Sequence, residues 1–113
     1  MIEKTVIRYL RKKFSEEKVG YEPPKGMTDR FVTVEKTGSQ QLTRGLYQST
    51  IAVQSWGKSK QEAAELSERV CTALREIPDE EDEVTSAYGA DYDFTDTTTK
   101  KYRYQAVFTF THY

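Results

Sequence analysis

The chain has 113 residues, 31% of them charged, and its 17 lysines and arginines nearly balance its 18 aspartates and glutamates, leaving a net charge of −1. This balance gives the whole chain no electrostatic attraction to nucleic acid or to an anionic membrane. No signal peptide opens the sequence, and no apolar run approaches the ~20 residues that span a bilayer. We therefore expect one soluble, intracellular domain over residues 1–113, with a single core.

Residues that could carry chemistry are few. Cys71 cannot form an intrachain disulfide, and we interpret it as a small apolar residue in a reducing compartment rather than as a reactive thiol. His112 is the penultimate residue, where fraying is common, so no Ser–His or Cys–His pair is expected. There is no zinc-ligand spacing and no glycine-rich phosphate loop. The sequence predicts no catalytic residue, no metal site and no cofactor, and hence not an enzyme.

Residues Ile2 to Phe14 predict an amphipathic helix. Its apolar face carries Val6, Ile7, Leu10 and Phe14. Its opposite face carries Arg8, Arg11, Lys12 and Lys13. This basic face is interpreted as solvated, with contact to phosphate groups as the alternative. The following segment, Ser15 to Asp29, contains two glycines and two prolines and predicts a loop.

Two strands are predicted next, Arg30 to Lys36 and Leu46 to Trp56, which form an antiparallel hairpin. The polar segment between them, Thr37 to Gly45, is longer than a tight turn needs, so it predicts a long loop at the hairpin tip. Such a loop is either a binding element held on a rigid hairpin or a mobile solvent loop. The sequence leaves both possibilities open.

The stretch from Ser49 to Ile77 gives the strongest structural prediction, a strand, a turn and a helix. Ser59 followed by Glu62 is a capping box, in which each side chain satisfies a backbone N–H at the start of the helix. Apolar residues then recur at three- and four-residue steps, at Ala63, Leu66, Val70, Ala73, Leu74 and Ile77. Pro78 is expected to end this helix.

The last third of the chain predicts a short acidic loop and two further strands. The loop, Asp79 to Glu83, lacks the glycine-containing spacing of a calcium loop. Val84 to Tyr92 predicts a strand, Asp93 to Lys100 a turn-rich connection, and Lys101 to Tyr113 a strand with clear alternation. The apolar face of that last strand is expected to pack on the helices rather than stack on nucleotide bases, and it carries Tyr102, Tyr104, Ala106, Phe108 and Phe110.

The predicted fold class is therefore α+β, in the order α-β-β-α-β-β. We expect a single antiparallel sheet of about four strands, with two helices packed on one face. A small sheet with free edges, a long hairpin tip and no predicted site is typical of a subunit in a symmetric assembly.

Three blocks of sequence resemble the tail-terminator and minor tail proteins of long-tailed bacteriophages, of the lambda type. They are Arg30-Phe-Val-Thr-Val-Glu-Lys-Thr-Gly38, then Ile51-Ala-Val-Gln-Ser-Trp56 with Ser59-Lys-Gln-Glu-Ala63, then Phe94-Thr-Asp96 ahead of Tyr102-Arg-Tyr-Gln105. The blocks follow the order and spacing of that family and extend over nearly the whole chain. The chain differs from the family pattern at Thr95, where proline is common, and in the Ser39-Gln-Gln41 segment after Gly38.

The resemblance implies a structural virion protein of the head–tail junction, present in the host cytoplasm during assembly. Members of the family form a ring, usually of six subunits, that caps the tail tube, stops its polymerisation and offers a docking surface to head completion proteins. The implied partners are further copies of the chain, the major tail tube protein and a head completion protein. DNA passes through the lumen without being read, and no membrane is involved.

Two sets of residues are expected to serve this role. Contacts to the next subunit or to the tube are assigned to Lys36, Gln40, Gln41, Arg44, Phe94 and Asp96. The lining of the lumen, where negative charge lets DNA slide, is assigned to Asp79, Glu80, Glu81, Asp82 and Glu83.

Two alternatives remain open from the sequence. One is a small regulatory or nucleic-acid-binding protein that uses the basic first helix. The other is a bacterial protein on the same scaffold, for instance in a contractile secretion apparatus.

Overall fold

The computed structural model describes residues 1–26, 30–99 and 101–113. In chain order these residues form α1 (Ile2–Lys13), β1 (Lys18–Gly20), β2 (Phe31–Thr43), β3 (Leu46–Gly57), α2 (Lys60–Arg75), α3 (Ile77–Glu80), β4 (Val84–Asp93) and β5 (Tyr102–His112). The last part of the segment predicted as a loop, at 27–29, and the end of the predicted connection, at 100, lie outside the described residues.

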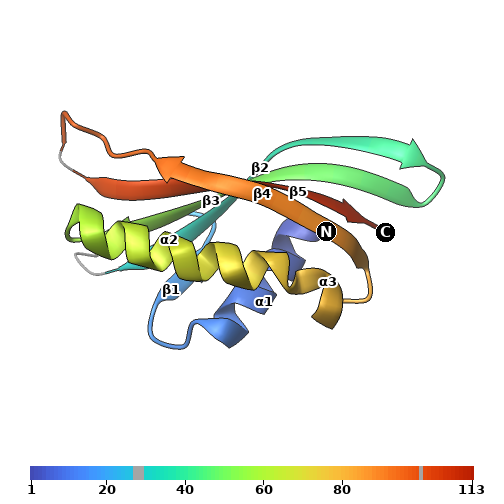
Figure 1. Cartoon of the computed structure of the whole chain (residues 1–113), viewed down its shortest axis with the longest axis horizontal. Coiled ribbons are helices and arrows are strands. Elements are labelled where there is room, and N and C mark those ends of the chain that lie inside the picture. The colour runs from blue at the N-terminus through green and yellow to red at the C-terminus, as the bar shows by residue number, and fades with distance from the viewer. Residues whose placement is uncertain (27–29, 100) are drawn as a thin grey trace.

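The strands form one sheet with all the helices on the same face, as Figure 1 shows. The strand order is β1-β2-β3-β5-β4. β1 pairs with β2 in parallel, and the other neighbours are antiparallel. The α+β class and the one-sided packing are as predicted. The prediction of a purely antiparallel sheet of about four strands with two helices was wrong, because the described residues form a mixed sheet of five strands and three helices.

The missed strand is β1, which lies inside the segment predicted as a loop. It has three residues, too few to show an alternation in the sequence. Tertiary contacts hold it in place. Val19 is 5% exposed and belongs to the core, and the buried carboxylate of Glu17, just before the strand, lies 3.1 Å from Nη1 of Arg69 on α2. These contacts dock the connection after α1 against α2 and bring Lys18–Gly20 beside Phe31–Thr33 of β2.

The hairpin tip also differs from the prediction. The segment expected to be a long loop after Lys36 continues β2 as far as Thr43, and a two-residue turn, Arg44-Gly45, leads into β3. Gly45 has a φ of 80°, which a glycine adopts without strain. The ladder continues to the Thr43–Leu46 pair, with irregularities after Lys36 and after Gln41. The end of the hairpin therefore projects beyond the helices as an arm (Figure 1), and β5 stays paired with its β3 strand as far as Tyr47.

A single hydrophobic core lies between the helices and the sheet. Its largest fully buried side chains come from the three helices and the three central strands, and include Leu10, Leu66, Ile77, Ile51 and Phe108. Each such side chain contributes roughly 1.5–3 kcal/mol by leaving water. The alternation predicted for the last strand is confirmed at Ala106, Phe108 and Phe110, whereas Tyr102 and Tyr104 are only half-buried.

Cys71 is part of this core, as its interpretation as a small apolar residue requires. Burial, as the main cause, raises the pKa of its thiol to about 11. The thiol therefore stays protonated, and so unreactive, at neutral pH.

The predicted N-terminus of the main helix is confirmed, since Ser59 Oγ accepts a hydrogen bond of 3.1 Å from the backbone N–H of Glu62. The helix ends at Arg75 rather than at Ile77. Pro78 lies in the first turn of the short helix α3, where its missing N–H costs no hydrogen bond. Asp79 and Glu80 are consequently helical and do not belong to a loop.

Gly89 gives a test of this packing. A Cβ atom at this position would lie against the carbonyl oxygen of Val107 and 2.7 Å from the Cα of Phe108, both on β5. Because these are backbone atoms of a central strand, Gly89→Ala is expected to lower the free energy of unfolding by about 1–3 kcal/mol in urea denaturation. The matched control is Gly38→Ala, since no atom lies within 4 Å of a Cβ there. An equal loss in both variants would contradict the argument.

Candidate subunit-contact surface

The residues predicted to make subunit contacts fall into two separate groups. Lys36, Gln40, Gln41 and Arg44 lie on the hairpin at one end of the sheet. Phe94 and Asp96 follow β4 at the opposite end, on the connection to β5 (Figure 1). The structure therefore does not unite the six residues in one patch.

The hairpin arm, residues Glu35 to Tyr47, is exposed except for the half-buried Leu46. It is an ordered ladder with polar contacts between its two strands. The amide of Gln40 donates to the amide oxygen of Gln48 at 2.8 Å, and Thr37 Oγ1 donates to the carbonyl oxygen of Thr50 at 3.3 Å. Helix α1 reaches the base of the arm, where Lys36 Nζ lies 3.8 Å from the carboxylate of Glu3, whereas the side chains beyond Lys36 are mostly exposed. Neither face of the arm therefore requires apolar residues. This explains why its sequence looked like a polar loop.

A chain of polar contacts crosses the base of the arm, from the exposed Ser39 to the buried Ser49 and His112. Ser39 Oγ lies 3.0 Å from Ser49 Oγ, which lies 2.8 Å from His112 Nε2. His112 was expected to fray, but it belongs to β5 and is only 8% exposed, because β5 pairs with β3 up to Tyr47. Its Nδ1 lies 3.3 Å from the main-chain oxygen of Tyr113, and no hydrogen bond to an aspartate or glutamate side chain is found for it among the described residues. The Ser–His contact thus joins β2, β3 and β5, without the orienting acid that a catalytic triad uses.

At the opposite end, Phe94 belongs to an aromatic cluster around Arg103. The Arg103 guanidinium lies 4.5 Å from the centre of the Phe94 ring and 4.8 Å from that of Trp56, and its Nε donates to the carbonyl oxygen of Phe94 at 2.8 Å. Trp56 stacks in turn on Phe31, with ring centres 5.2 Å apart. These contacts hold the connection after β4 against the sheet.

Asp96 closes the turn that follows. Its carboxylate accepts hydrogen bonds from the backbone N–H groups of Thr98 and Thr99. The hydrogen bonds from the Thr99 side chain and from these backbone groups hold the pKa of Asp96 below its ordinary value. The structure therefore gives Asp96 a role within its own turn.

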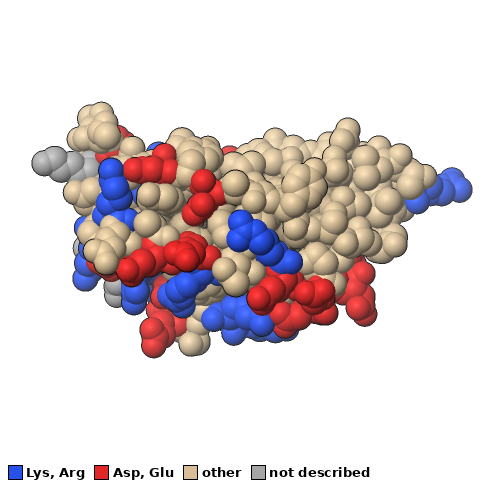
Figure 2. Space-filling view, viewed as in Figure 1, with Lys and Arg blue, Asp and Glu red and all other residues tan. Residues whose placement is uncertain are grey.

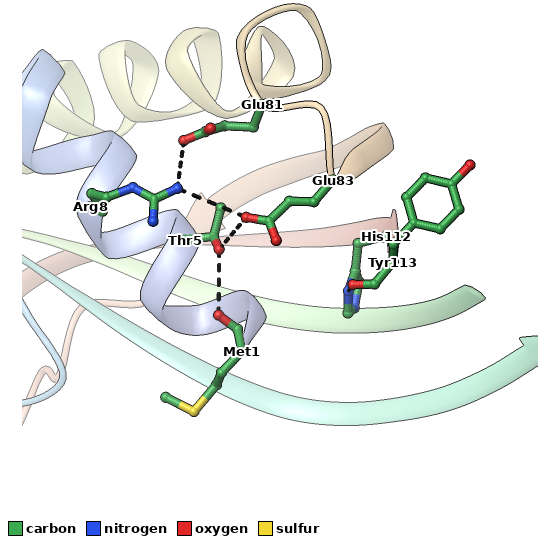
Figure 3. A network of polar contacts seen from close by, with 7 residues as sticks. All are labelled: Met1, Thr5, Arg8, Glu81, Glu83, His112 and Tyr113. Atoms are coloured by element: carbon green, nitrogen blue, oxygen red, sulfur yellow. Dashed lines mark hydrogen bonds and ion pairs between the residues drawn. The ribbon is translucent and has the colours of Figure 1, made fainter. Parts of the chain in front are cut away.

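Much of the acidic segment predicted to line a lumen faces α1 (Figure 3). Arg8 Nη2 lies 3.1 Å from Glu81 and 3.9 Å from Glu83, whose carboxylate also accepts a 2.6 Å hydrogen bond from Thr5 Oγ1. Glu80 lies 2.9 Å from Lys13 and accepts a 2.7 Å hydrogen bond from the buried Tyr9 hydroxyl. No ion pair is found for the two aspartates of the segment, Asp79 and Asp82, among the described residues.

The same contacts occupy part of the basic face of α1. Arg8 and Lys13 face the acidic segment, and Arg11 Nε donates to the carbonyl oxygen of Val19 at 2.9 Å. Sequence reasoning treated the basic helix and the acidic run separately because about 70 residues lie between them. Figure 2 shows charges of both signs mixed over the helices rather than a patch of one sign.

Both edges of the sheet are open within the described part of the chain. β1 covers the outer side of β2 only at Phe31–Thr33, so β2 has no outer neighbour from Val34 to Thr43. β4 is the other edge, with no outer neighbour from Val84 to Asp93. Natural edge strands usually carry devices that prevent pairing with another chain, such as proline and inward-pointing charges. Neither edge contains proline, but β2 carries Lys36 on its helix side and irregularities after Lys36 and Gln41, and β4 carries Asp91 on its helix side and an irregularity after Val84. The stretch from Ser86 to Ala90 carries no charge and no irregularity.

Across residues 1–26, 30–99 and 101–113, no three His, Cys, Asp or Glu side chains form a group that could hold a metal ion. No helix in these residues has the length and apolar character to cross a membrane. A scan of protein-family models finds no match to the chain, and a search of curated proteins finds no match either.

The contact between α1 and α3 predicts a pH effect. Hydrogen bonds from Tyr9 and Lys13 hold the pKa of Glu80 below its ordinary value. A carboxyl group whose pKa is lowered on folding stabilises the fold at pH values above its pKa in the unfolded chain. This stabilisation is lost as the pH falls through its pKa in the folded chain. The melting temperature of Glu80→Gln should therefore fall less between pH 5 and pH 3 than that of the wild type, as measured by calorimetry. Glu16→Gln, at an exposed site, is the control and should behave like the wild type; an identical acid response of Glu80→Gln would contradict the prediction.

Proposed function

We propose that the protein is a structural subunit of the head–tail junction of a long-tailed bacteriophage. It forms a ring, by resemblance a hexamer, that caps the tail tube, ends its polymerisation and offers the docking surface for head completion proteins. Its working location is the virion, and it is present in the host cytoplasm during assembly.

The observation that carries this proposal is the hairpin arm. The hairpin arm is ordered and exposed and extends beyond the hydrophobic core, with β5 paired to its β3 side as far as Tyr47. Ordering a chain segment costs conformational entropy, and an arm outside the core regains little of it within its own chain. The contacts that benefit from this ordered shape are those with another copy or with the tube. Lys36, Gln40, Gln41 and Arg44 are the side chains proposed to make them.

The acidic segment remains our proposal for the lumen, in a weaker form than the sequence suggested. Three of its carboxylates face cations or hydroxyls of α1, which offsets part of their charge. The exposed Asp79 and Asp82 are left as the principal source of the negative potential that would let DNA slide.

Binding of nucleic acid through α1 is the second candidate. It is favoured by a cleft bordered by Lys4, Arg11 and Lys12 together with Tyr21. We rank it lower because Arg8 and Lys13 already face carboxylates of the same chain. A salt-dependent shift of labelled duplex DNA, abolished when the basic residues of α1 are changed, would reverse this ranking.

The proposal is tested by light scattering and negative-stain imaging, over a wide range of protein concentration and with purified tail tubes added. Closed rings, free or seated on tube ends, are expected. Replacing Gln40, Gln41 and Arg44 together by alanine should leave the melting temperature nearly unchanged, because these side chains are exposed, and should weaken assembly at least about tenfold, since lost contacts of about 1.4 kcal/mol in total suffice.

The matched control replaces three exposed residues outside the arm, Lys58, Gln61 and Glu65, by alanine. It should assemble like the wild type. Normal assembly of the arm variant would show that the arm is not the contact, and failure of the wild type to join tube ends would contradict the proposed function itself.

A further inference from the structure

The proposed function leaves open how neighbouring copies meet, and the two open edges of the sheet supply an answer. The two open edges lie on opposite sides of the sheet: β2 from Val34 to Thr43, beyond the part that β1 covers, and β4 from Val84 to Asp93. Each presents unpaired backbone N–H and C=O groups, which can template a strand from another chain.

We propose that the occupant of each edge is a second copy of this chain: the outer edge of β4 in one copy pairs with the outer edge of β2 in the next. This inference rests on the proposed function, in that it names the contact between ring subunits. It yields a head-to-tail interface that uses both edges of every copy. A two-fold dimer through β4 alone would leave every β2 edge open.

Strand direction is compatible with this pairing. β2, β3, β5 and β4 are antiparallel in succession, so β4 runs opposite to β2 within one chain. In a ring whose axis lies roughly along the strands, the next copy keeps the same strand directions. β4 of one copy would then meet β2 of the next as an antiparallel pair, the more stable arrangement.

The pairing registers also place the two open edges at the same level along the strands. Val34 pairs with Val53, which pairs with Ala106, which pairs with Asp91. At the other end of the open edges, Gln41 pairs with Tyr47, which pairs with His112, which pairs with Val84. Residues 34–41 of one edge are therefore level with residues 84–91 of the other, so two copies placed side by side without stagger present matching segments.

β1 limits this register. It covers β2 up to Thr33, which is level with Tyr92 through Gln54 and Gln105. A neighbouring β4 can thus pair from Asp91 back to its start, but it cannot slide further along β2 without meeting β1. The short parallel strand acts as a stop that sets the pairing.

On the face away from the helices, the level positions are complementary in size. Gly38 and Tyr88 share a level, through Thr50 and Thr109. Tyr88 is 60% exposed in the single chain. A tyrosine beside a cross-strand glycine covers the backbone that the glycine leaves exposed, a known stabilising pair in sheets.

On the helix side of the sheet, the pairs through Ile51 and Phe108 place Lys36 level with Gly89. Asp91, two residues beyond Gly89 along the same face, is the diagonal neighbour of Lys36. Within one chain, Lys36 Nζ lies 3.8 Å from the carboxylate of Glu3, and the Asp91 carboxylate accepts a hydrogen bond of 2.7 Å from Ser67 Oγ. Diagonal positions lie about 7–8 Å apart at their Cα atoms, within reach of a long side chain. A cation on one edge would therefore meet a carboxylate on the other.

Cysteine cross-linking tests this register. Gln40 and Ser86 are level on the face away from the helices. Within one chain three strand spacings, about 14 Å, separate them, and this exceeds the roughly 7 Å limit for a disulfide. A disulfide in the variant Gln40→Cys with Ser86→Cys must therefore join two copies. The native Cys71 is buried and does not compete with the introduced cysteines for disulfide formation.

The matched control is Gln40→Cys with Tyr92→Cys. It uses the same face and the same two strands, but it is out of register by six residues, about 20 Å. A second level pair, Glu35→Cys with Ala90→Cys, has both sites exposed in the single chain and guards against a folding defect in the first variant. Under mild oxidation each level pair should give a ladder of covalent multimers at least about tenfold faster than the control.

The possible outcomes test the edge pairing and the proposed function separately. Rings in the microscope without faster cross-linking of the level pairs would overturn edge pairing and leave the proposed function standing. Fast cross-linking into open fibres that do not join tube ends would support edge pairing and contradict the ring. Absence of both assembly and cross-links, with tubes present, would overturn both.

Discussion

The packing of α2 across the sheet is the constraint on which the rest of the structure depends. Its apolar stripe, including Leu66, Val70 and Leu74, covers the helix side of β3, β4 and β5. A helix of 16 residues is about 24 Å long, whereas strands of 12 and 13 residues extend for about 40 Å. α2 therefore cannot cover the full length of β3, and α1, which packs on β2, has only 12 residues and is about 18 Å long. The uncovered end of this hairpin becomes the polar arm.

This constraint also explains which elements the sequence could reveal. The main helix and the last strand were predicted because one face of each is buried. Apolar residues therefore recur every three to four residues in the helix and every second residue in the strand. The far half of β2 has no buried face, so its strand conformation left no alternation to read. β1 was missed for a related reason, since three residues depend on contacts such as Glu17 with Arg69 that only the folded chain creates.

The candidate site was predicted less well than the fold because its contacts join distant segments. Glu80 and Lys13 lie far apart in the chain, and α3 brings them within 2.9 Å. His112 looked like a terminal residue prone to fraying, yet the register of β5 places it beside Ser49. The residue types were visible in the sequence, but their partners depend on how the elements pack.

The arm and the open edges favour assembly through backbone pairing rather than through an apolar patch. The arm's side chains are mostly polar, so a single copy exposes little apolar surface there apart from Leu42 and Tyr47. Backbone groups of an edge strand form hydrogen bonds with water in the single chain and with a second strand in an assembly. Each hydrogen bond between copies therefore contributes only a modest free energy to association. Such contacts become stable when each copy is held by two neighbours at once, because closing a ring converts the last association into an intramolecular step. In the ring that we propose, this closure would make weakly associating single copies stable as an assembly.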